Sequence, residues 1–126
     1  MLTLHPCVRI YVCTAPTDMR RGFDGLAQMA RDIVRQDPLS GHDFVFLNRR
    51  RDRVKILYWD HDGYAVWAKR LEAGTFRLPA ATGGHLELRH AELAMLLGGI
   101  DPAGSRRRVR FSLPRPDPVS TGPVGS

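Results

Sequence analysis

Residues 43–69 constrain the fold more than any other part of the chain, because three short strand-like runs follow one another there with only turns between them. Residues 44–47 (FVFL), 54–59 (VKILYW) and 64–69 (YAVWAK) are rich in aromatic and β-branched side chains. The first link between these runs has the length of a hairpin loop, and the second, DHDG at residues 60–63, is a strong turn signal. The segment therefore predicts an antiparallel meander of three strands.

A strand and an amphipathic helix are expected before this meander. Residues 8–13 (VRIYVC) have strand composition. Either Thr17 or Asp18 can cap the start of a helix, and Asp37-Pro38 ends the helical pattern. Apolar side chains recur between these limits at spacings of three and four, as on one face of a helix: Phe23, Leu26, Ala27, Ala30, Ile33 and Val34.

Charged residues surround the expected helix start. Arg20 and Arg21 lie beside Asp18 and Asp24 in the sequence. These residues can brace the turn through internal ion pairs, or the arginines can face outward and bind an anion. We favour the internal ion pairs.

Shorter elements follow the meander. Residues 75–78 (TFRL) and 85–88 (HLEL) are candidates for short strands. Residues 91–100 predict a short helix, with Gly98-Gly99 as its stop. One face of that helix is apolar and consists of Leu93, Leu96, Leu97 and Ile100.

The order of these elements predicts an α+β fold with a mostly antiparallel sheet (a meander), one longer helix and one short helix. The 126 residues are the length of one domain, and we assign residues 1–102 to it. Residues 103–126 are rich in arginine and proline and contain little that a core could bury. We expect them to form a disordered basic tail.

Basic charge is concentrated in two places. The formal net charge is +6, and residues 103–126 contribute most of it. The remaining cluster is the expected loop at residues 49–53, where guanidinium groups could bind phosphates bidentately or could simply keep a hairpin tip solvated. The candidate nucleic-acid-binding residues are Arg49, Arg50, Arg51, Arg53, Arg106, Arg107, Arg108 and Arg110.

Aromatic residues of the meander could stack nucleic-acid bases or fill the core. They are Tyr58, Trp59, Tyr64 and Trp67. Strand alternation places Trp59 and Tyr58 on opposite faces, so at least part of the set must face the core. We favour core packing.

No set of residues has the spacing of a catalytic or metal site. Asp60, His61 and Asp62 are metal-ligand types, but adjacent residues of a tight turn point in different directions. We interpret them as a turn in which Gly63 is free to take a positive φ. No nucleophile or phosphate-loop pattern is present either, so we predict no catalytic residue, no metal and no cofactor. The two cysteines are expected to be reduced structural thiols.

Apolar runs are too short to span a membrane, and the first residues lack a secretory pattern. We therefore expect a cytoplasmic protein without a membrane partner. The sequence leaves its oligomeric state open.

Several ordered motifs resemble the TnpB accessory family, the product of the second open reading frame of the insertion sequence 66 elements of bacteria. The resemblance extends from about residue 8 to residue 102. The motifs are PTDMRRGFDGL (16–26), DPLSG (37–41), FVF (44–46), KILYWDHDG (55–63), KRLE (69–72) and ELAMLLGGID (92–101).

The resemblance implies an association with DNA transposition, beside a separate transposase that carries the nuclease chemistry. It supplies no catalytic residues. Arg89-His90 stands where relatives often place a small capping residue such as serine or threonine, which puts the start of the second helix in question.

Our leading hypothesis is a non-catalytic accessory protein of transposition that binds DNA, the transposase or both through the two arginine clusters. A second hypothesis is a protein-interaction module without DNA contact, which docks the transposase through a sheet face or the helix at residues 93–100. A third is a small basic ribonuclease of the toxin type, suggested by size, charge and the strand at residues 53–58. Such toxins place helices before most of the sheet, so this hypothesis ranks last.

Overall fold

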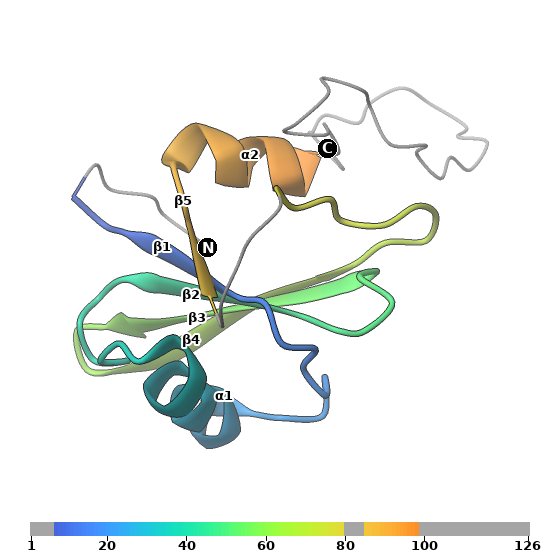
Figure 1. The fold of residues 1–126 in the computed structure, drawn as a ribbon. Helices are drawn as coiled ribbons and strands as arrows, with labels where there is room; N and C mark the ends of the chain where they lie inside the picture. Colours follow the sequence, from blue (N-terminus) through green and yellow to red (C-terminus); the bar gives the residue numbers. More distant parts are fainter. Residues whose placement is uncertain (1–6, 80–84, 99–126) are drawn as a thin grey trace, which may run out of the picture.

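A five-stranded sheet with a helical segment on each face forms the centre of the computed structural model, which describes residues 7–79 and 85–98 (Figure 1). The strand order is β4-β3-β2-β1-β5. The elements are β1 (Ile10–Cys13), α1 (Phe23–Met29), a π-helical turn η1 (Ala30–Val34), β2 (Asp43–Leu47), β3 (Arg53–Asp60), β4 (Gly63–Arg70), β5 (His85–Leu88) and α2 (His90–Gly98).

The sheet is mostly antiparallel, as the sequence predicted. Strands β2, β3 and β4 form the expected meander, and β5 pairs antiparallel with β1. Only β1 and β2 are parallel, because the chain crosses over between them through α1 and η1. The α+β class is confirmed. The sequence did not predict the parallel pair.

Strand alternation divides the core between the two sheet faces. On one face, Val45 and Ile56 pack under Leu93 and Leu96 of α2. On the other, Phe44, Phe46 and Leu57 pack against Leu26, Ala27 and Ala30 of the α1–η1 segment. Every residue of β1 and β2 is buried, which fits their central places in the sheet.

The first helix starts later than the sequence predicted. Its N-cap is Gly22, and no side chain caps it, so the assignment of Thr17 or Asp18 as the cap was wrong. Thr17 is buried and its N–H donates to the Leu47 carbonyl at 2.9 Å, while the Asp18 carbonyl accepts from the Arg21 N–H at 3.1 Å. Both residues therefore belong to a separate turn that links β1 to α1.

The predicted apolar stripe of this helix is correct except at its first residue. Leu26, Ala27, Ala30 and Val34 are buried, but Phe23 is 51% exposed because it is the first residue of the helix. The segment closes as a π-turn that ends at Arg35, whose φ of 64° is left-handed.

Residues 75–78 do not form the expected strand. The Phe76 N–H donates to the carbonyl of Arg51 in the β2–β3 loop at 2.7 Å, and the Phe76 side chain is fully buried. The N–H of Leu71 likewise donates to the Asp52 carbonyl at 2.7 Å. This segment satisfies its backbone against a loop, so its apolar residue fills the core without strand pairing.

The second helix begins at His90 despite the absence of a small capping residue. The Glu92 carboxylate accepts the Arg89 N–H at 2.8 Å, which is one half of a capping box, and this bond lowers the pKa of Glu92. Leu93 and Leu96 are buried as expected, whereas Ile100 lies outside the described residues. None of the described helices is long and apolar enough to cross a membrane.

The turn at residues 60–63 connects β3 to β4 as predicted, but a different residue takes the unusual conformation. His61 has a φ of 58°, and Gly63 is absent from the residues with positive φ. Because Gly63 pairs with Asp60, it is already the first residue of β4, and the loop proper has only two residues.

A carboxyl group is buried where α2 meets the sheet. Asp43 is 2% exposed, and within residues 7–79 and 85–98 no donor reaches its Oδ2 atom. His90 Nε2 is also buried without a partner in that part of the chain. Burial raises the pKa of Asp43 to about 6, although the charge of nearby His90 opposes this shift.

We expect stability to depend on Asp43 between pH 4 and pH 6. The ordinary pKa is 3.8, so the folded state retains a proton in this interval that the unfolded state has lost. The contribution of Asp43 to stability is therefore most favourable below pH 4, falls as the pH rises to about 6, and stays at the lower value above it.

Asp43→Asn removes this penalty and should increase the free energy of unfolding at pH 7.5 by roughly 2 to 3 kcal/mol. Urea unfolding at pH 4.5 and pH 7.5 measures both effects, with exposed Asp24→Asn as the control. An Asp43→Asn variant no more stable than the wild type at pH 7.5 would show that the carboxylate is not destabilising.

Candidate nucleic-acid interface

Residues 48–53, here called the arginine loop, connect β2 to β3 and are organised by one side chain. Asn48 Oδ1 accepts the N–H groups of Asp52 and Arg53, both at 3.0 Å, and Asn48 Nδ2 donates to Asp52 Oδ1 at 2.6 Å. The Arg51 N–H donates to the Asn48 carbonyl at 3.0 Å. The backbone of the loop is thus fixed from within.

The loop is also fixed from outside. Its Arg51 and Asp52 carbonyls accept the N–H groups of Phe76 and Leu71. Arg51 has a left-handed φ of 58°, which is uncommon for a residue with a side chain, and its N–H and carbonyl are both bonded. The conformation is therefore held by its neighbours and is connected to the core through buried Phe76.

The loop presents concentrated positive charge. Arg49, Arg50, Arg51 and Arg53 are exposed, and none of them forms an ion pair within the described residues. Four arginines and Asp52 leave a net charge of +3 on residues 49–53. The hydrogen bond from Asn48, followed by the charges of Arg50 and Arg53, lowers the pKa of Asp52. The prediction from the sequence that these arginines lie on an exposed loop is confirmed.

The tail part of the predicted surface lies outside the described residues. This part comprises Arg106, Arg107, Arg108 and Arg110. Their contribution to nucleic-acid binding stays a prediction, as does the disordered tail at residues 103–126.

A small cavity adjoins the arginine loop. It has a volume of about 160 Å³ and lies where the parallel strands β1 and β2 end at the same edge of the sheet. Arg49 and Arg51 line it, whereas Arg50 and Arg53 do not. The other described lining residues include no acidic one: Cys13, Thr14, Ala15, Pro16, Leu47, Asn48 and Leu78.

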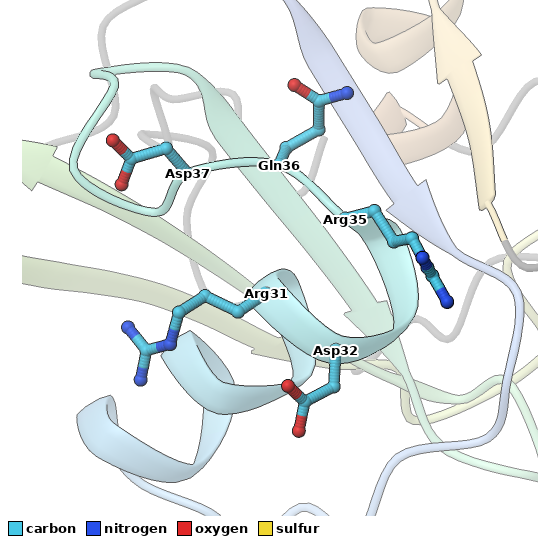
Figure 2. A pocket seen from close by; sticks show the side chains of 5 residues that line it. All are labelled: Arg31, Asp32, Arg35, Gln36 and Asp37. Atoms are coloured by element: carbon cyan, nitrogen blue, oxygen red, sulfur yellow. The ribbon is translucent and has the colours of Figure 1, made fainter.

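A second hollow is an open groove of about 720 Å³ at the end of η1 (Figure 2). It is lined by Arg31, Asp32, Arg35, Gln36 and Asp37. Figure 2 shows the side chains of Arg31 and Arg35 pointing in different directions. Asp32 Oδ2 already accepts from Gln28 at 2.7 Å, and Asp37 Oδ1 from the Leu39 N–H at 2.9 Å. Because both signs of charge line this groove, it offers no net attraction to an anion.

His61 and Asp62 form the β3–β4 turn and Asp60 is the last residue of β3, in agreement with the interpretation of this segment as a turn. In the described part of the chain, histidine, cysteine and acidic residues form no group of three or more that could hold a metal ion.

The aromatic residues of the meander are half-buried and mostly part of the core. Tyr58 and Trp67 pack against the α2 face of the sheet, and Tyr64 packs against the α1 face. Trp59 meets Tyr64 edge to face, with ring centroids 5.2 Å apart. This arrangement agrees with the preference for core packing over a base-stacking platform.

The turn before α1 contains one of the ion pairs that the sequence favoured, whereas Arg21 and Asp24 form none within the described residues. Arg20 binds Asp18 at 2.8 Å and lowers the pKa of that carboxyl to about 2. Sequence reasoning overlooked Lys55, whose Nζ donates to the carbonyls of Met19 and Arg21 at 2.7 and 3.0 Å. The signal that could have identified it is strand alternation, which places Lys55 on the same sheet face as buried Leu57.

Asn48→Ala should loosen the arginine loop. The substitution leaves the N–H groups of Asp52 and Arg53 without their acceptor, so we expect a loss of roughly 1 to 3 kcal/mol in the free energy of unfolding. Urea unfolding measures this loss, and amide hydrogen exchange at the two residues should become faster. Gln36→Ala is the control. Unchanged exchange would show that Asn48 does not order the loop.

Comparison with known proteins extends over all the described strands and helices. The model of the family described as "IS66 Orf2 like protein" matches residues 8–107. The chain is 39% identical over 101 residues to the uncharacterized protein y4hO of Sinorhizobium fredii, covering 80% of this chain and 88% of that protein. It is 37% identical over 101 residues to y4jC of the same organism, covering 80% and 86%. No solved structure matches the chain.

Proposed function

Because the chain belongs to the family of IS66 Orf2-like proteins, which associates it with transposition, we propose that it is a non-catalytic accessory protein that binds duplex DNA through its arginine loop. The supporting observation is the set of four exposed arginines on a loop that the core fixes in place. The partner surface is the phosphate backbone, which positions a protein on DNA without reading its sequence.

The concentration of unpaired arginines in one loop supports this proposal. Outside the loop, Arg9, Arg20, Arg70 and Arg89 each bind a carboxylate at 2.8 to 3.3 Å. The arginines at 21, 31, 35 and 77 form no ion pair within the described residues, but they are dispersed along the chain. The four loop arginines form no ion pair within the described residues, and the one acidic residue of the loop, Asp52, already accepts from Asn48. Their charge is therefore available to an external anion. Because the loop backbone is already ordered, DNA binding requires little further ordering of it.

Contact with the transposase of the same element is a second candidate function. It is favoured by two exposed apolar residues: Phe23, the first residue of α1, is 51% exposed, and Leu39, in the loop after η1, is 52% exposed. The apolar face of α2 is less suited to docking than the sequence suggested, because Leu93 and Leu96 are fully occupied in the core.

Replacing the loop arginines should weaken DNA binding. We expect the variant with alanine at 49, 50 and 53 and asparagine at 51, which tolerates the left-handed conformation, to bind duplex DNA at least about tenfold more weakly in low salt. The slope of log affinity against log salt should fall by roughly 0.9 for each phosphate that the variant no longer neutralises. Fluorescence anisotropy between 50 and 200 mM salt measures both quantities.

A matched control has four exposed arginines outside the loop, Arg9, Arg20, Arg31 and Arg70, replaced by alanine, which gives the same change in charge. Equal weakening of both variants would indicate a general charge effect. If the loop variant bound DNA with the affinity of the wild type, the loop would have no role in DNA binding. The second function would instead be favoured if the wild type retained the transposase in a high-salt pull-down and a variant with serine at both Phe23 and Leu39 did not.

A further inference from the structure

We propose that the cavity beside the arginine loop binds one phosphate group through Arg49 and Arg51. As its occupant we favour a phosphodiester of the DNA backbone, and in this respect the inference rests on the proposed function. Arg50 and Arg53 do not contact the phosphate in this proposal and contribute only positive electrostatic potential around the site.

The position of the cavity follows from the sheet topology. Strands β1 and β2 are parallel neighbours, so Cys13 and Leu47 end at the same edge. The chain then leaves the two ends in different directions, towards α1 and towards β3 (Figure 1). Open α/β sheets bind ligands where the ends of parallel strands diverge, because the departing segments leave a crevice between them, and β1 and β2 are the parallel pair of this sheet.

The size of the cavity suits a single small polar group. Its 160 Å³ has room for more than one water molecule. Pockets for whole small molecules measure roughly 300 to 1,000 Å³. A phosphate with a few waters therefore fits, whereas a complete nucleotide does not.

The chemistry of the lining favours an anion. Two arginines line the cavity, and no acidic residue does so among the described lining residues. A guanidinium can donate two parallel hydrogen bonds to phosphate oxygens, so two of them could hold one group from different sides.

The loop arginines divide into two pairs. The charges of Arg50 and Arg53 act on the Asp52 carboxylate, whereas Arg49 and Arg51 line the cavity. Bonds from Asn48 and Phe76 to its backbone fix the left-handed conformation of Arg51. The backbone of the site is therefore held before a ligand arrives, which lowers the entropic cost of binding.

Inorganic phosphate tests the site without DNA. The full chain is titrated with phosphate at constant ionic strength, and amide shifts are followed by NMR. We expect saturable shifts at Thr14, Ala15 and Arg49 in the wild type. Binding should be at least about tenfold weaker in R49A/R51N, and within about twofold of wild type in R50A/R53N, which has the same charge change.

Shifts that do not saturate, or equal weakening in the two double variants, would overturn the proposed site. Thermal unfolding of each variant checks that both remain folded. If R49A/R51N fails to fold, R49A alone is compared with R50A alone by the same titration, and equal phosphate affinity would again overturn the site.

DNA binding by the same variants identifies the source of the phosphate. Stronger loss of affinity in R49A/R51N than in R50A/R53N supports a DNA phosphodiester as the occupant. Phosphate binding without DNA binding retains the site, assigns it to free phosphate and rejects the proposed function. If both double variants weaken DNA binding equally and phosphate binding does not saturate, the proposed function is retained and this inference is rejected.

Discussion

The parallel pairing of β1 with β2 is the constraint on which the rest of the structure depends. Both strands are buried along their full length in the middle of the sheet, and the chain must cross one sheet face to join them in parallel. The α1–η1 segment makes this crossing and covers one face, while α2 covers the other. The same pairing brings two strand ends to one edge, where the Thr17 N–H bonds the Leu47 carbonyl.

The arginine loop shows how a small domain can keep concentrated charge in a fixed place. Like charges repel, so a flexible loop would spread them apart. Here Asn48 bonds the loop internally and Phe76 connects it to the core. The guanidinium groups remain free of carboxylates within the described residues, and the scaffold supplies the order that a binding surface needs.

Much of the fold could be predicted from local patterns. Alternating side chains indicated the meander, and the spacing of Leu26, Ala30 and Val34 indicated the helix. Errors arose where distant residues decided the outcome. Residues 75–78 have the composition of a strand, yet the Phe76 N–H donates to the carbonyl of Arg51, in a loop twenty-five positions earlier. Thr17 has the character of a helix cap, yet its N–H bonds the end of β2.

The sequence by itself determined the α+β class and the presence of an arginine cluster in a turn, because hydrophobic period, turn residues and charge are local properties of the chain. Its ordered motifs also determined the family. Only the tertiary structure decided that β1 pairs parallel with β2, that Asp43 is buried, and that Arg49 and Arg51 line a cavity while Arg50 and Arg53 do not. These features depend on which segments meet across the sheet. Such meetings are set by the packing of residues far apart in the chain, which no single stretch of sequence specifies.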